Sequence, residues 1–176
     1  MSLVQYQCTM SLDGFIAGPG GDMQWMNDVE TPPSSLAEGL AEKSVVLLTG
    51  ARTFRGDDPN VDTDAEGAYG GTFDGSSVVL THHPDDPPPH GVEFAGDLMA
   101  AVERCRELAG DGTVAVLGAD VARQCLAAGV LDEVLVFVEP ILLGDGVRLF
   151  DWPGGRTVHL DVIEVSDLAL RARVVR

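Results

Sequence analysis

The sequence predicts an α/β fold with a mostly parallel central sheet and a C-terminal antiparallel hairpin. Apolar strand patterns alternate with helical patterns over residues 3–140, and strands that alternate with helices pair in parallel through right-handed crossovers. Residues 156–176 instead form two runs of alternating apolar and polar positions, which is typical of a hairpin. The 176 residues hold no internal repeat and no dividing linker, so we expect one domain spanning 1–176.

In the first half, apolar runs and capping residues define the elements. The run 3–10 predicts a buried strand, and it leads into a glycine-rich connection at 11–25. Residues 32–43 predict a helix, with Ser35 as N-cap and Glu38 completing a capping box. The remaining assignments are a buried strand at 44–49, a short helical turn at 51–54 and a long acidic loop at 56–75.

The second half repeats the alternation. Asp97 is expected to cap a helix that Gly110 ends, and a further helix runs from Asp120 to Gly129. The inward face of that second helix is predicted to carry Val121, Cys125 and Ala128. Strand patterns fall at 76–81, 92–94, 113–117 and 132–140, and connections at 82–90 and 141–150.

Composition narrows the possible partners. The formal charge is −17, from 11 basic and 28 acidic residues, so long-range repulsion argues against nucleic acid or an anionic membrane. No apolar run is long enough to span a membrane, and no secretory leader is evident. The three cysteines are odd in number and far apart, which favours reduced thiols and a cytoplasmic protein.

Motifs for metal, nucleophilic and phosphate-loop chemistry are weak or absent. The acidic alternation at 58–64 lacks the glycine and the final glutamate of a calcium loop. The histidines of the 82–90 loop do not have zinc-ligand spacing, so we expect no metal. The sequence contains no G-x-x-x-x-G-K-[ST], no G-x-S-x-G, and neither half of the zinc deaminase signature.

Four turns that follow predicted strands remain, after Met10, Thr49, Thr81 and Leu117. In a parallel sheet such turns meet beyond the carboxyl ends of the strands, where ligands bind. Glycine there permits close backbone approach, and the amides at a helix start attract phosphate. The arginines at 52 and 55 would supply positive charge in an acidic protein.

Five stretches, taken together, resemble the dihydrofolate reductase superfamily. More closely, they are similar to the reductase domain of the bifunctional riboflavin-biosynthesis deaminase–reductase and its stand-alone relatives. The resemblance spans nearly the whole chain, in the expected order. It rests on "SLDGFIAGPGGDMQW", "GARTF", "VVLTHHP", "VLGADVARQCLAAGVLDEV" and "EPILLGDGVRLF".

This resemblance implies a three-layer α/β/α fold and an NADPH-dependent reductase of a small-molecule substrate, acting as a homodimer. Thr9 and Ile16 would lie near the nicotinamide, and Asp13 at the mouth of the substrate site as a candidate proton donor. The phosphates would contact Gly50, Arg52 and Thr53. The adenosine ribose and its 2′-phosphate would contact Thr81 and His82, and the pyrophosphate would contact Gly118, Ala119, Asp120 and Val121.

The chain departs from the family pattern at several of these positions. Ala51 replaces the arginine that usually follows the glycine, and Ala119 replaces the second glycine of the pyrophosphate turn. As an N-cap, Asp120 would compete with phosphate for the helix-start amides. Dihydrofolate reductases keep an acid on the helix after the first loop, and Glu30 lies at roughly that spacing from Trp25.

We therefore expect hydride transfer from NADPH to a C=N or C=O carbon, driven largely by positioning of the two reactants. An aspartate at position 13 would need a raised pKa to donate the proton. Three alternatives stay open: a catalytically inactive ligand-binding or sensing protein on the same fold, a dihydrofolate reductase, and a Rossmann-type transferase, against which the missing G-x-G-x-x-G counts. Asp13-Gly14 could equally be a plain turn.

Overall fold

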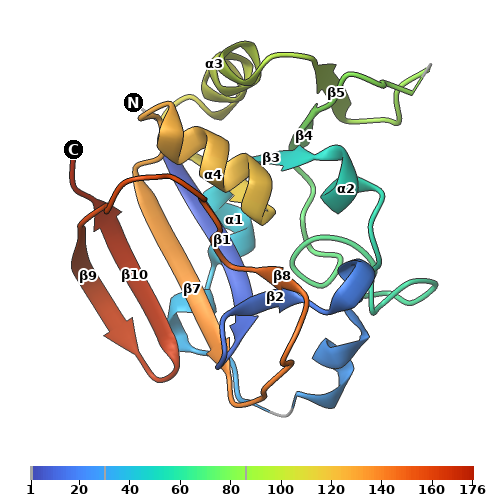
Figure 1. Cartoon of the computed structure of the whole chain (residues 1–176). Helices are drawn as coiled ribbons and strands as arrows, with labels where there is room; N and C mark the ends of the chain where they lie inside the picture. The colour runs from blue at the N-terminus through green and yellow to red at the C-terminus, as the bar shows by residue number, and fades with distance from the viewer. Residues whose placement is uncertain (1, 30, 86) are drawn as a thin grey trace.

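The computed structural model describes residues 2–29, 31–85 and 87–176. Its centre is one twisted sheet in which five neighbouring strand pairs are parallel and only the C-terminal hairpin is antiparallel (Figure 1). In sheet order the strands are β5 (Val92–Ala95), β4 (Ser76–Leu80), β3 (Ser44–Gly50), β6 (Thr113–Leu117), β1 (Leu3–Ser11), β7 (Glu133–Glu139), β10 (Ala169–Val174) and β9 (Leu160–Ser166). The predicted α/β class and terminal hairpin are confirmed.

Helices cover both faces of this sheet, as a three-layer fold requires. The longer ones, α3 (Leu98–Ala109) and α4 (Ala119–Ala127), lie on one face, and the short α1 (Leu40–Lys43) packs behind β3 (Figure 1). The main core fills the space beneath α3 and α4, because alternate strand residues point there. Its fully buried side chains include Val4, Tyr6, Leu48, Val116, Cys105 and Cys125. Among the described helices, none is both long and apolar enough to cross a membrane.

Helix α3 forms as its sequence predicts. The Asp97 carboxylate accepts a hydrogen bond from the Ala100 amide at 3.0 Å, which satisfies one of the free amides of the first turn. Gly110 ends the helix at φ 58°, a conformation that glycine adopts without strain.

The predicted helix at 32–43 is wrong in extent and in its cap. A 3-10 turn, η3 (Ser35–Ala37), and the four-residue α1 replace it, because Gly39 adopts φ 63° between them. Ser34, not Ser35, caps the turn by accepting from the Leu36 amide at 3.2 Å. Glu38 is extended at the end of η3, so the capping box does not form.

Helix α4 also begins differently from the prediction. It starts at Ala119 with Gly118 as the N-cap residue, so Asp120 lies inside the first turn and is not the cap. Its buried side chains are Val121, Ala122 and Cys125, whereas Ala128 is exposed beyond the last turn.

The two connections that looked irregular in the sequence pair with each other. Strand β2 (Phe15–Ala17), from the 11–25 stretch, forms a small antiparallel sheet with β8 (Val147–Arg148), from the 141–150 stretch. Two 3-10 turns follow β2, namely η1 (Pro19–Gly21) and η2 (Gln24–Asp28). This two-stranded sheet lies beyond the carboxyl ends of β1 and β7, where it forms one wall of the site (Figure 1).

Candidate active site

A broad cleft opens at the carboxyl ends of the parallel strands. Turns after β3, β4 and β6 form one side, and the small sheet and the 19–28 segment form the opposite side. The 56–75 loop and the 31–40 segment close the remaining edge. The position follows from topology, since these strands all run the same way and their polar turns gather at one edge.

The residues predicted to hold a cofactor come together in this cleft. Its lining includes Thr9, Ile16, Gly50, Arg52, Thr53, Thr81, His82, Gly118, Ala119, Asp120 and Val121. They belong to separate stretches of sequence that only the fold brings together. Asp13 is the one predicted site residue that does not line the cleft.

The turn from β6 into α4 is shaped for close backbone approach. Gly118 has φ 93°, and a Cβ atom there would meet the Thr53 hydroxyl of helix α2 (Ala51–Phe54). Ala119 is the first helical residue and does not have a positive φ, so alanine in place of a second glycine costs no strain. The first amides of α4 lack intrahelical acceptors and point to the cleft.

The Asp120 carboxylate does not compete for those amides. One oxygen accepts from the Arg123 guanidinium at 2.8 Å and the other from the Gln124 amide at 3.0 Å, along the helix surface. The pKa of Asp120 is lowered, first by the Arg123 hydrogen bond. The expectation that Asp120 would occupy the amides is therefore wrong, because the residue lies one position too far into the helix to cap it.

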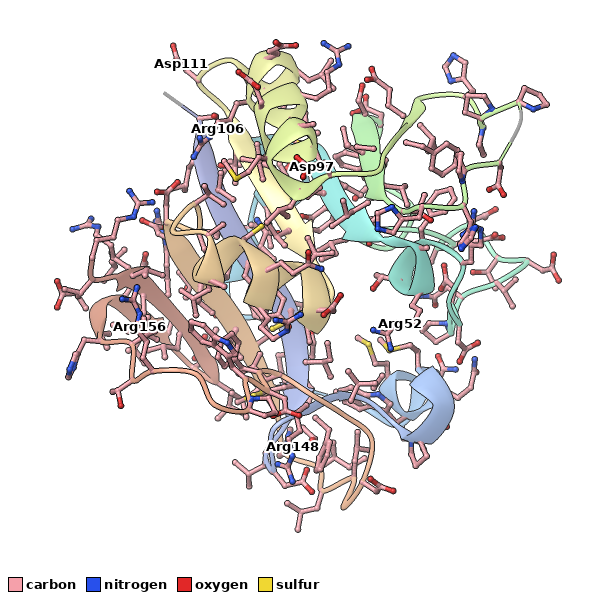
Figure 2. The ribbon with its side chains drawn as sticks, turned by 45° about the horizontal axis from the view of Figure 1, so that its top comes forward. Arg52, Asp97, Arg106, Asp111, Arg148 and Arg156 are labelled. Carbon is pink, nitrogen blue, oxygen red and sulfur yellow. The ribbon has the colours of Figure 1, made fainter. Side chains whose placement is uncertain are left out.

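Among the arginines near these turns, Arg52 makes no ion pair with any described residue, whereas Arg55 does. Arg55 is held by the Asp85 carboxylate at 2.9 Å and by the His83 carbonyl at 3.0 Å. Arg52 is exposed and lies beneath α2, on the side that faces the 19–28 segment (Figure 2).

Asp13 is a structural residue of the β1–β2 turn. Its carboxylate accepts from the Ser11 hydroxyl at 2.6 Å and from the backbone amides of Leu143 and Gly144 at 3.1 and 2.7 Å. These bonds, the one from Ser11 first, lower its pKa, whereas a proton donor needs a raised one. The turn alternative for Asp13-Gly14 fits these contacts, and Gly14 supplies the φ of 88° that the turn needs.

Replacing Asp13 with asparagine should lower Tm without changing the pH profile of turnover. The bonded carboxylate has a folded-state pKa below its unfolded value, so its contribution to stability is complete above the unfolded pKa and disappears as pH falls through the folded one. Thermal melts of both proteins from pH 7 to pH 2 would therefore show a Tm gap that closes in acid. A shifted pH–rate profile in the variant would instead return Asp13 to the proton path.

A buried polar network on the sheet face behind the cleft was not predicted. The Glu133 carboxylate accepts from Arg171 at 2.8 Å and from Gln5 at 3.0 Å, and Gln7 donates to Gln5 at 2.9 Å. Tyr69 of the 56–75 loop donates to Gln7 at 2.5 Å, which fastens the acidic loop to the sheet. The spacing of Gln5 and Gln7 on one face of a buried strand was the available signal.

The same loop is also joined to the opposite wall of the cleft. Asp57 accepts from the Met23 amide at 2.9 Å and from the Gln24 side chain at 3.0 and 3.1 Å. These contacts bridge η2 and the start of the acidic loop, so the cleft narrows between them.

Two further lining residues were missed by sequence reasoning. Cys8 borders the cleft, and burial raises the pKa of its thiol to about 12, so it is not a nucleophile at neutral pH. Glu139, the last residue of β7, lines the cleft with one carboxylate oxygen buried and without a hydrogen-bond partner among the described residues. A charged residue at the carboxyl end of a buried strand was the signal that could have identified it.

Comparison with protein families places this geometry in context. The family model described as the RibD C-terminal domain matches residues 2–172. A search of curated proteins finds no match.

Solved structures share the fold at low sequence identity. A candidate riboflavin biosynthesis protein from Shewanella sp. PV-4 has a TM-score of 0.74 and 21% identity, over 99% of both chains. A deaminase/5-amino-6-(5-phosphoribosylamino)uracil reductase from Thermotoga maritima has a TM-score of 0.62 and 21% identity, over 98% of this chain and 56% of that one. The riboflavin biosynthesis reductase Rib7 of Saccharomyces cerevisiae has a TM-score of 0.61 and 18% identity, over 99% and 90%.

Proposed function

The chain belongs to the RibD C-terminal domain family of reductases, and from this premise we propose that it transfers hydride from NADPH to a C=N or C=O carbon of a small heterocycle-linked sugar substrate. The observation that carries the proposal is the convergence of the turns after β3, β4 and β6 on one cleft. An expected set of eleven cofactor residues from separate stretches all line it.

The residues present fit a dinucleotide. Because Gly118 has no Cβ, the Thr53 hydroxyl packs close to the start of α4. A pyrophosphate at this turn would meet both that hydroxyl and the first amides of the helix. Arg52 lines the same cleft and would pair with a phosphate in place of the arginine missing at position 51. Thr81 and His82 border the same side for the adenosine end.

Bound NADPH supplies the hydride, and the protein supplies position and a dry contact. Thr9 and Ile16 lie on β1 and β2, whose ends flank the cleft, so their backbone groups fix where the nicotinamide ring would rest. The bridge from Asp57 to Met23 and Gln24 narrows the opening and limits water. Because the Asp13 carboxylate is bound in its turn, we propose that a single water bound beside the substrate supplies the proton.

We propose as substrate a pyrimidine whose attached sugar, in its open-chain form, presents the C=N or C=O carbon, by analogy with the uracil reductase that the Thermotoga protein is named for. Folate is the weaker candidate, since the family match is to the RibD C-terminal domain. Glu30, the acid near the spacing that a folate site would need, lies outside the described residues.

Titration of purified protein with NADPH and with NADH tests the cofactor directly. We expect micromolar NADPH binding and an affinity for NADH that is lower by roughly tenfold or more. Only NADPH carries the 2′-phosphate, which makes a charge-assisted contact with the protein. Quenching of Trp25 and Trp152 reports binding, and calorimetry confirms it. Equal affinities for NADPH and NADH would contradict the proposed contact with the 2′-phosphate. Absence of binding of either cofactor by folded protein would favour the binding-protein alternative.

The alternative of an inactive binding or sensing protein has lost one of the two observations that supported it. It rested on Ala51 and on Asp120 blocking the amides, and the Asp120 carboxylate is bound to Arg123 and Gln124 instead. The other observation, Ala51 in place of the usual arginine, remains, but Arg52 lines the cleft and would take the role of that arginine.

We further propose a cytoplasmic homodimer joined through β9. Three free thiols support the location. The edge strand β9 exposes the apolar side chains of Val162 and Val165, at 61% and 64%, which an isolated chain would leave in water. Both lie on one face of the strand, because a bulge in the register pairs them with Ala172 and Leu170. Sedimentation equilibrium at micromolar concentration measures the mass, and the mass of a single chain would contradict the dimer.

A further inference from the structure

Glu139 lies where a bound substrate would sit. In the register of β1 and β7, Thr9 pairs with Phe137 and Ser11 with Glu139, so Phe137 and Glu139 project on the same face as Thr9. Thr9, Phe137 and Glu139 all line the cleft. Glu139 therefore lies two residues beyond Phe137, and Phe137 pairs with Thr9, the proposed nicotinamide contact.

The Glu139 carboxylate has an unused acceptor. Its Oε2 atom is buried, and no described residue donates a hydrogen bond to it. A buried carboxylate oxygen without a donor costs free energy, so its retention in a cleft indicates a partner that arrives with the ligand. An ionised carboxylate only accepts hydrogen bonds, so its partner must be a donor. The N–H groups of a heterocycle are donors of this kind.

The charge of the cleft lining as a whole favours an N–H edge over a phosphate. Besides Glu139, its acids include Asp22, Asp57, Asp58, Glu66, Asp145 and Asp151. Of the lining arginines, Arg55 and Arg123 are paired with Asp85 and Asp120, and the Arg148 guanidinium lies 4.8 Å from the centre of the Phe15 ring. A phosphate would meet mainly like charge here, whereas N–H donors are attracted.

We propose that Glu139 is the residue that recognises the substrate ring, by accepting hydrogen bonds from a ring N–H or an amino group of an aminopyrimidine. The inference rests on the proposed reductase function and names the group of the substrate that the site selects. Segment 31–40 lines the same cleft, and the bond from Ser34 Oγ to the Ser166 carbonyl, at 3.0 Å, anchors that segment to the end of β9.

Calorimetric titration with 5,6-diaminouracil, with and without saturating NADP⁺, tests this role. We expect wild-type protein to bind it and Glu139→Gln to bind at least tenfold more weakly, because the variant loses a charged acceptor. The 1,3-dimethyl analogue, which lacks ring N–H groups, should bind wild type more weakly and lose less on substitution. Glu103→Gln is the matched control, since Glu103 is exposed on α3 and does not line the cleft, and the affinity of this variant should equal that of wild type.

Thermal stability separates recognition from a structural role. Removing an unpartnered carboxylate should leave Tm of Glu139→Gln unchanged or raised, and a fall in Tm would indicate a structural contact instead. Equal binding of diaminouracil by wild type and Glu139→Gln, or no binding by wild type, overturns the inference. Because the titration without NADP⁺ does not need the cofactor, failure of NADPH binding alone would count against the proposed function and not against Glu139.

Discussion

Gly118→Ala should abolish NADPH binding in the micromolar range. The added Cβ meets the Thr53 hydroxyl, and φ 93° is a conformation that alanine rarely adopts. Relief requires the turn to move, which withdraws the α4 amides from the phosphate position. We expect NADPH affinity to fall by roughly 100-fold and the free energy of unfolding by about 2 kcal/mol. Fluorescence titration and urea denaturation measure the two effects.

Gly129→Ala is the matched control, since Gly129 follows the other end of the same helix with φ 71° and open space around its Cβ. It should lower stability by about 1 kcal/mol through backbone strain alone and leave NADPH affinity unchanged. Adding Thr53→Ala to Gly118→Ala removes the hydroxyl contact and should recover part of the stability. Unchanged NADPH affinity in folded Gly118→Ala would place the cofactor elsewhere.

Arg171→Met should destabilise the fold more than any other single arginine substitution in the terminal hairpin. Arg171 neutralises the Glu133 carboxylate at 2.8 Å, and the Glu133 side chain is only 6% exposed. Without the guanidinium, the buried Glu133 carboxylate keeps Gln5 as its one remaining side-chain donor among the residues that the structure describes. Because Arg171 itself is 34% exposed, water relieves part of the penalty, and we expect a loss of about 2–3 kcal/mol in urea denaturation.

Two further variants identify the cause of that loss. Arg176→Met breaks the ion pair between Arg176 and Asp132, whose side chains are 58% and 27% exposed. It should lower the free energy of unfolding by less than about 1 kcal/mol. Glu133→Gln in the Arg171→Met background removes the uncompensated charge and should restore stability, as coupled neighbours do. If Arg171→Met and Arg176→Met cost the same, the buried network does not stabilise the sheet.

The sequence predicted the sheet well because its strands carry strong local signals. Runs such as 44–49 and 113–117 are apolar and β-branched, and their burial on both faces leaves little alternative to a parallel strand. The Asp97 cap is equally local, since the aspartate bonds an amide three residues away. Such features depend on neighbours in sequence, which a single sequence shows directly.

Errors arose where distant residues decide. The helix expected at 32–43 has good propensity, but the segment serves as a cleft wall tied to Ser166, and Gly39 interrupts it. The small sheet pairs β2 with β8, two stretches too short to give a periodic signal. Likewise, the partner of Asp13 is the 143–144 backbone, which no local pattern indicates. In the site, resemblance located the cofactor turns, whereas Glu139 stood out through its buried carboxylate oxygen and its place in the cleft.

Asp132 joins the two ends of the chain. Its backbone donates to Val4 of β1 and accepts from Val174 of β10 at 2.9 Å each, so the first and last strands start and finish together. That meeting point lies at the amino ends of the parallel strands, the edge of the sheet opposite the cleft (Figure 1). A tag or a further catalytic module appended at either end would leave the cleft unobstructed. The topology therefore suits genetic fusion, immobilisation on a support and circular permutation, with the joint remote from the chemistry.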